Sequence, residues 1–186
     1  MKKLILVPFL LFSVSSFSQT EKGKQIFGGT ADMSMSFQGK VSTFFMNFSP
    51  TFGVFAVKNF AIGGRYSFGI NSRRAPNDEG EYRSTTTFTT AIGPLAKYYF
   101  GKKQMKGFIS ANGSYLVNTT MTKGNVTNRN GYTAGGALGC AYFFNEHVGL
   151  ETAFYVQLTG YESGLPNTRG GISVGVFTFL DRKKKE

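Results

Sequence analysis

Cysteine, histidine and long apolar runs are scarce in this 186-residue sequence, and each scarcity excludes a class of protein. Cys140 is the only cysteine, so an internal disulfide or a cysteine metal cluster is excluded. His147 is the only histidine, which leaves few candidates for the base of a catalytic site. Beyond the first nineteen residues no run reaches eighteen apolar residues, which argues against a membrane-spanning helix.

Acidic residues are also scarce, 10 against 21 lysines and arginines, so the formal net charge is +11. A basic balance of this size would normally suggest a nucleic acid partner. The start of the chain argues against that, because two lysines, an apolar run and small residues near position 18 form the pattern of a secretory signal. We therefore expect residues 1–18 to be a signal peptide. Residues 19–186 would form one exported barrel domain with a short basic C-terminal tail.

The clearest periodicity lies on both sides of Lys58 and Asn59, where every second residue is apolar and those between are mostly small or polar. A period of two with one apolar face is typical of a strand between two different environments. Lipid outside and a polar lumen inside give a transmembrane barrel this pattern. The residues expected to face lipid include Met46, Phe48, Phe52, Val54, Ile62, Tyr66 and Phe68.

The same alternation recurs along the chain and predicts eight strands. Connections after the second, fourth and sixth strands are short, whereas those after the third, fifth and seventh, at residues 71–84, 119–130 and 161–168, are long and polar. Outer-membrane barrels have short periplasmic turns, longer outer loops and an even strand count. We therefore predict an all-β protein, an eight-stranded antiparallel up-and-down transmembrane β-barrel in the cell outer membrane, with both termini in the periplasm.

Aromatic residues gather near the predicted periplasmic ends of the strands, at residues 98–100 and 142–144 and at Phe177 and Phe179. Aromatic side chains are enriched where a membrane meets water. We expect these residues to form an interfacial girdle around the barrel.

Two runs carry a resemblance to a known family. FSPTFGVFAVKNFAIGGRYSF (residues 48–68) and AIGPLAKYYF (residues 91–100) resemble the recurring signature of small outer-membrane β-barrel proteins of Gram-negative bacteria, related in shape to OmpA- and OmpX-type barrels. The resemblance implies an eight-stranded antiparallel barrel in the outer membrane. It implies no single activity.

Four charged residues fall on the predicted inward face, and they carry two charges of each sign. An eight-stranded lumen is narrow enough to be filled by side chains, and charges buried there must be paired. Arg169 is assigned instead to the outer end. We predict a neutral polar network that plugs the lumen, formed by Asp32, Arg65, Lys97 and Glu151 with Tyr155 and Gln157.

A plugged lumen favours a structural or surface-interaction role for an integral outer-membrane protein. Two alternatives stay open. The first is a narrow porin-like channel for small solutes. The second is a soluble periplasmic ligand-binding barrel, which would place the phenylalanine-rich face inside.

The sequence predicts no catalytic, cofactor-binding or metal-ligating residues, so an enzyme is not expected. His147 lies beside Glu146 in a predicted periplasmic turn, and no phosphate-binding loop is present. The expected partners are phospholipid headgroups at the basic periplasmic rim, lipopolysaccharide outside, and an extracellular ligand at the outer loops. The residues expected to contact lipopolysaccharide phosphates are Arg73, Arg74, Arg83 and Arg129.

Overall fold

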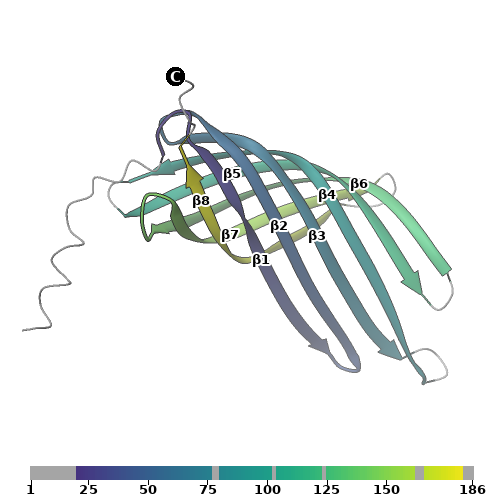
Figure 1. Ribbon diagram of the computed structural model, residues 1–186. Helices are drawn as coiled ribbons and strands as arrows, with labels where there is room; N and C mark the ends of the chain where they lie inside the picture. The colour runs from purple at the N-terminus through teal and green to yellow at the C-terminus, as the bar shows by residue number, and fades with distance from the viewer. Residues whose placement is uncertain (1–19, 77–79, 102–103, 123–124, 162–165, 182–186) are drawn as a thin grey trace, which may run out of the picture.

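The computed structural model of the protein describes residues 20–76, 80–101, 104–122, 125–161 and 166–181. In this part of the chain, eight antiparallel strands form one closed barrel in sequence order, which confirms the predicted topology (Figure 1). No helix among these residues is long and apolar enough to cross a membrane. The predicted signal peptide and basic tail lie outside the described residues. The strands are β1 (Gln25–Gln38), β2 (Val41–Val57), β3 (Phe60–Pro76), β4 (Tyr82–Phe100), β5 (Met105–Thr122), β6 (Asn125–Phe143), β7 (Val148–Tyr161) and β8 (Asn167–Leu180).

The apolar face of the strands points away from the lumen, as the alternation predicted. Met33 and Phe154 are 73% and 72% exposed, and Phe52 is 60% exposed. Strict alternation from the inward Phe55 would also turn Val57 inward, but the β2–β3 register shifts between these two residues and leaves the Val57 side chain exposed. The phenylalanine-rich face is therefore the outer surface of the barrel.

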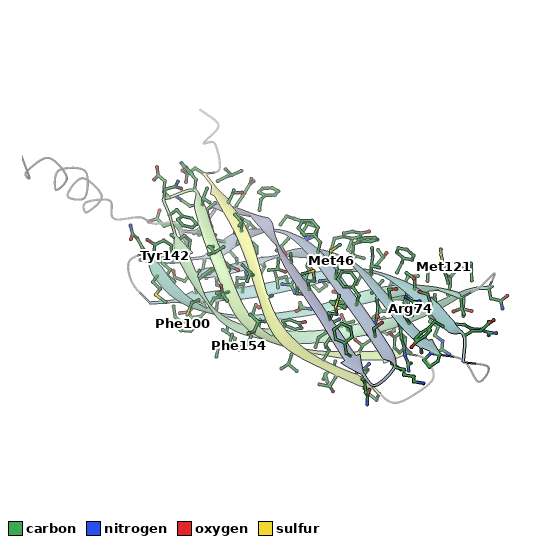
Figure 2. The ribbon with its side chains drawn as sticks, turned by 90° about the horizontal axis from the view of Figure 1, so that it is seen from below. Met46, Arg74, Phe100, Met121, Tyr142 and Phe154 are labelled. Atoms are coloured by element: carbon green, nitrogen blue, oxygen red, sulfur yellow. The ribbon has the colours of Figure 1, made fainter. Side chains whose placement is uncertain are left out.

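The barrel has two different ends (Figure 2). The terminal end holds the start of β1, the end of β8 and the turns near Asn59, Phe100 and Tyr142, and the opposite, hairpin end holds Arg74 and Met121. Asn59 has a φ of 67° in the β2–β3 turn. Asparagine tolerates this left-handed backbone better than most residues, which explains why the chain can reverse there.

Strands at the hairpin end are longer than predicted and extend into the loops predicted at residues 71–84, 119–130 and 161–168, so these connections are shorter than predicted. The β3–β4 register continues to Pro76↔Tyr82, and the β5–β6 register continues to Thr122↔Asn125. Residues 119–130 are rich in threonine, which favours strands, whereas residues 71–84 contain none, and neither segment has an apolar face. Because hydrophobic alternation stops before pairing does, the periodicity underestimates these strands.

Backbone pairing is interrupted at two prolines in the wall and is short at the junction of the first and last strands. The β2–β3 register omits Ser49 and Pro50, and the β4–β5 register omits Gly93 and Pro94, as expected where proline lacks an N–H group. The β1–β8 register is short, with seven pairs from Gln25↔Leu180 to Ala31↔Val174. We call this last junction the seam.

The lumen as a candidate functional site

Aromatic side chains fill the lumen at the terminal end. Neighbouring rings lie close together, with centroids 5.1 Å apart for Phe143 and Phe179 and 5.7 Å apart for Phe55 and Tyr99. All six rings are at most 3% exposed, so they form a close-packed cluster inside the barrel. We call them the aromatic plug: Phe55, Tyr99, Phe108, Phe143, Phe177 and Phe179.

The predicted interfacial girdle is therefore wrong for Tyr99, Phe143, Phe177 and Phe179, which point inward and are 0% exposed. The exposed neighbours along the same strands do lie on the outer surface, and they are Tyr98, Phe100, Tyr142 and Phe144. Adjacent residues of a strand point to opposite faces, so a run of three aromatic residues must divide between lumen and outer surface.

A buried ion pair lies against the aromatic plug. Lys97 Nζ is 2.6 Å from Glu151 Oε2, and both side chains are 3% exposed. Glu151 Oε1 also accepts a hydrogen bond of 2.6 Å from the Tyr99 hydroxyl. The ammonium lies 4.3 Å from the ring centroid of Phe177 and 4.7 Å from that of Phe108. The structure thus brings together two of the predicted site residues and adds Tyr99, which the sequence analysis placed in the girdle.

Residues 20–24 cover the terminal end of the lumen. Thr20 is buried, its carbonyl accepts a 2.7 Å hydrogen bond from the Asn59 N–H, and its hydroxyl accepts one of 2.6 Å from Lys106 Nζ. The Gly23 N–H donates to the Phe55 carbonyl over 2.8 Å. The sequence contains no periodicity that would have identified this short segment as a cap.

The other half of the lumen is a cavity of about 420 Å³ lined mainly by hydroxyl and amide side chains, which we call the vestibule. Many of these groups hydrogen-bond across neighbouring strands. Thr89 donates to Asn118 over 2.6 Å, Asn118 donates to Tyr161 over 2.6 Å, and the Ser49 and Ser67 hydroxyls are 2.8 Å apart. The vestibule is therefore polar, and hydrogen bonds among its lining side chains hold them in place.

A second ion pair crosses the seam inside the vestibule. Asp32 Oδ1 on β1 lies 3.7 Å from Arg169 Nη2 on β8, and Asp32 Oδ2 accepts a 3.0 Å hydrogen bond from Asn47. The Arg169 guanidinium also lies 3.2 Å from the ring centroid of Phe45 on β2, and Tyr155 interacts electrostatically with both Asp32 and Arg169. Arg169 is the third residue of β8 and lies at the hairpin end, but its side chain turns into the lumen, which the sequence analysis did not predict.

Arg65 on β3 belongs to neither ion pair. Its Nη1 donates to Asn112 Oδ1 over 3.4 Å, and its buried Nε has no hydrogen-bond partner within the described parts of the chain. Gln157 lines the vestibule without joining either pair. The six residues of the predicted network face the lumen but do not form one network. Lys97 and Glu151 form one ion pair, Asp32 belongs to the other with Tyr155 beside it, and Arg65 and Gln157 belong to neither.

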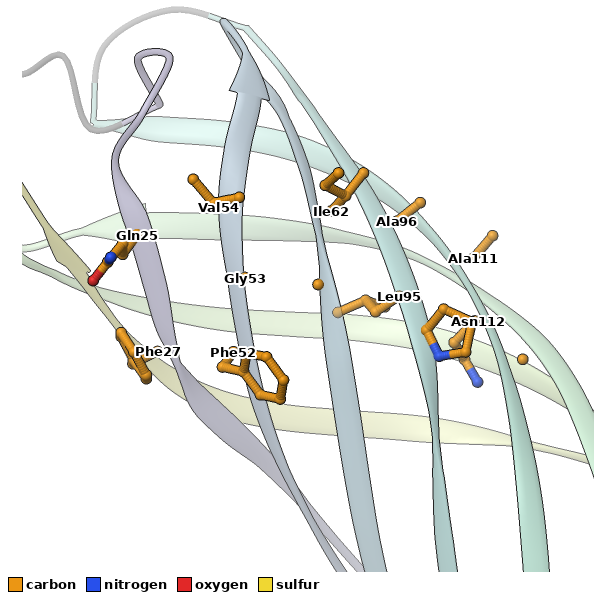
Figure 3. A pocket seen from close by; sticks show the side chains of 13 residues that line it. Gln25, Phe27, Phe52, Gly53, Val54, Ile62, Leu95, Ala96, Ala111 and Asn112 are labelled. Atoms are coloured by element: carbon orange, nitrogen blue, oxygen red, sulfur yellow. The ribbon is translucent and has the colours of Figure 1, made fainter. Parts of the chain in front are cut away.

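A larger hollow of about 860 Å³ lies on the wall formed by β1 to β5 (Figure 3). Its labelled side chains include the exposed, outward-facing Phe27, Phe52, Val54, Ile62 and Ala111. None of its lining residues carries an acid, a base or a nucleophile. This hollow therefore offers no charged or nucleophilic side chain, whereas the lumen contains two ion pairs.

His147 lies at the terminal end, away from the vestibule. Its Nδ1 is 3.1 Å from the Phe179 carbonyl oxygen, and its Nε2 is 3.6 Å from Glu146 Oε1 on an exposed turn. Across the described ranges, no group of three or more histidine, cysteine, aspartate or glutamate side chains could hold a metal ion.

Comparison with known proteins reveals relatives in fold alone. No protein family model matches the sequence, and no curated protein matches it. Among solved structures, outer membrane protein OprG from Pseudomonas aeruginosa aligns with a TM-score of 0.58 at 13% identity, over 88% of this chain and 99% of that one. The N-terminal β-barrel domain of Pseudomonas aeruginosa OprF has a TM-score of 0.51 at 14% identity over 86% and 98%. Neisserial surface protein A has a TM-score of 0.51 at 18% identity over 83% and 94%. The chain thus has the eight-stranded barrel fold of small outer-membrane proteins.

Proposed function

We propose that this protein is an integral outer-membrane barrel with a closed lumen, which acts without catalysis as a structural or surface-interaction protein. A continuous apolar outer surface supports a membrane location, because soluble monomers rarely expose large apolar patches. Side chains on that surface come from every part of the barrel wall, for example Met33, Phe52, Tyr115 and Phe154.

The observation that supports a closed lumen is the aromatic plug, together with the buried Lys97–Glu151 pair that lies against it. Water and ions could pass only if several rings and a buried ion pair moved together, and close-packed interiors resist such rearrangement. This arrangement favours a barrel that presents its hairpin end to the surroundings over one that transports solutes through its axis.

Conductance measurements test this proposal. In planar lipid bilayers the wild-type protein is expected to show no sustained conductance, because the aromatic plug closes the axis. The double variant Phe143→Ala/Phe179→Ala removes two rings that are 5.1 Å apart and is expected to open measurable ion conductance. Its matched control is Tyr142→Ala/Phe144→Ala, which removes two exposed rings beside the same plug residue. Steady conductance of the wild-type protein would support the porin-like alternative instead.

We further propose that the terminal end faces the periplasm and the hairpin end faces outward. The start of β1 and the end of β8 both lie at the terminal end, and the even strand count of outer-membrane barrels is consistent with both termini in the periplasm. In this orientation Arg73, Arg74, Arg83 and Arg129 lie on strands at the outer end, where they would meet lipopolysaccharide phosphates. Lys22 and Lys58 lie at the periplasmic end, where they would meet anionic phospholipid headgroups.

Cysteine labelling of intact cells tests location and orientation together. In a Cys140→Ala background, Asn128→Cys on the β5–β6 hairpin is expected to react with a membrane-impermeant maleimide, because Asn128 is exposed at the hairpin end. Lys58→Cys in the β2–β3 turn is expected to react only after the outer membrane is permeabilised. The reverse pattern would invert the orientation, and recovery of the protein in the soluble periplasmic fraction would favour the ligand-binding barrel.

A further inference from the structure

The charges in the lumen do not balance, because neither Arg65 nor Arg129 has a carboxylate partner in the described ranges, and Arg65 is the more buried of the two. Between the aromatic plug and the hairpin end, Lys97 is paired with Glu151 and Arg169 with Asp32, at 2.6 and 3.7 Å. Among the described residues no carboxylate lies within ion-pair distance of Arg65. The predicted neutral network is thus replaced by one with a surplus positive charge, because Arg169 also points inward.

The Arg65 side chain is half-buried and faces an open space. It lines the vestibule, where Nη1 donates a long hydrogen bond of 3.4 Å to Asn112, and its Nε is buried without a partner among the described residues. Thr133 Oγ1, on the same cavity, is likewise buried without a partner in the described chain. Buried polar groups and charges are costly unless a partner satisfies them.

The shape and lining of the vestibule suit a small polar ligand. Its volume of about 420 Å³ lies in the range of small-molecule sites. Apart from Arg65, Arg129, Arg169 and Asp32, the lining carries neutral groups, mostly the hydroxyls and amides of serine, threonine, asparagine and tyrosine. Such groups can donate and accept hydrogen bonds, so they complement a hydroxylated molecule.

We propose that the vestibule binds a small hydroxylated organic anion, whose carboxylate or phosphate group pairs with Arg65. A guanidinium presents a planar set of donors that matches either acid group with two parallel hydrogen bonds. The anion supplies the missing negative charge, and its hydroxyl groups lie against the threonine and asparagine side chains of the wall. This inference deepens the proposed function and rests on it for its biological setting, since an outward vestibule would receive its ligand from the cell exterior.

The binding test uses the purified, refolded full barrel in detergent micelles at low ionic strength. Sodium gluconate, sodium acetate and inorganic phosphate are titrated while arginine side-chain Nε resonances are followed by NMR, with glucose as the uncharged control. Gluconate is expected to bind saturably, at least tenfold more tightly than acetate, and glucose to cause no saturable shift. The Nε signal of Arg65, assigned from an Arg65→Lys variant, is expected to move most.

Two charge-removing variants locate the site. Arg65→Gln is expected to weaken gluconate binding at least tenfold, whereas Lys40→Gln, which removes an exposed charge in the β1–β2 turn outside the vestibule lining, is expected to change it less than twofold. Equal binding by wild-type protein and Arg65→Gln would overturn the proposal, as would linear shifts confined to the exposed arginines.

Folding of each variant is checked by its heat-dependent gel mobility. If Arg65→Gln does not fold, the wild-type Arg65 resonance alone decides the outcome, because a saturable shift supports the site and its absence overturns it. Failure of this test leaves the conductance and labelling results unchanged, so it is distinguishable from failure of the proposed function.

Discussion

Substitution of Glu151 by glutamine is expected to lower the free energy of unfolding by about 3–5 kcal/mol, the cost of breaking a buried ion pair from one side. Glutamine keeps the shape of the side chain but carries no negative charge. The Lys97 side chain, which is only 3% exposed, would then have no counter-charge. The rings of Phe108 and Phe177 offset only part of that loss. The chain has no tryptophan, so urea unfolding is followed by far-UV circular dichroism and gel mobility.

The control for this variant is an ion pair of similar length near the surface. Lys24 lies 3.1 Å from Asp181, whose side chain is 64% exposed, and Asp181→Asn is expected to cost less than about 1 kcal/mol. The double variant Lys97→Met/Glu151→Leu removes both charges and is expected to recover most of the lost stability. If Glu151→Gln and Asp181→Asn have the same effect, burial of the Lys97–Glu151 pair is not what stabilises the lumen.

A second large effect is expected from Gly93→Ala in β4. A Cβ atom built at Gly93 would lie 1.9 Å from the Gly113 carbonyl oxygen and 2.6 Å from the Ser114 Cα, both of which belong to the backbone of β5. A backbone obstacle cannot rotate away as a side chain can, so the strands would have to separate. We expect a loss of about 3 kcal/mol, at the upper end of typical overpacking costs, measured by the same urea unfolding experiment.

The matched control is Gly113→Ala, at the same level of the wall and on the neighbouring strand. Its nearest neighbour would be the Thr133 carbonyl oxygen at 3.8 Å, an ordinary contact distance. This variant is expected to fold with a free energy of unfolding within about 1 kcal/mol of the wild-type value, since alanine also restricts the unfolded chain. A larger loss for Gly113→Ala than for Gly93→Ala would contradict the close approach of β4 and β5 at Gly93.

Hydrophobic alternation predicted the barrel because one face of each strand meets a uniform apolar environment. That signal identified Phe52 and Ile62 as outward and Lys97 and Glu151 as inward, and the structure places all four accordingly. The same signal fails where both faces of a strand are mostly polar, as at residues 71–76 of β3 and 119–122 of β5. Pairing there depends on backbone hydrogen bonds, which produce no hydrophobic periodicity in the sequence.

The internal contacts of the lumen were only partly predictable. Arg169 and Asp32 are far apart in sequence and meet only because the barrel closes β8 onto β1. Tyr99 and Phe143 stand within aromatic triplets, so composition suggests a surface girdle unless the strict alternation of the strand is followed through the triplet. The docking of Thr20 depends on Asn59 and Lys106, a tertiary arrangement with no local sequence signal.

The seam has a consequence for the order of assembly during biogenesis. It joins Gln25 to Leu180, the most distant pairing in the chain, and closing so long a loop carries the largest entropic cost. Two rings of the aromatic plug, Phe177 and Phe179, are carried by β8 itself. A nascent chain that lacks β8 would therefore have two open strand edges and an incompletely filled lumen. Closure of the barrel wall and completion of the aromatic plug would therefore occur together, when β8 pairs with β1.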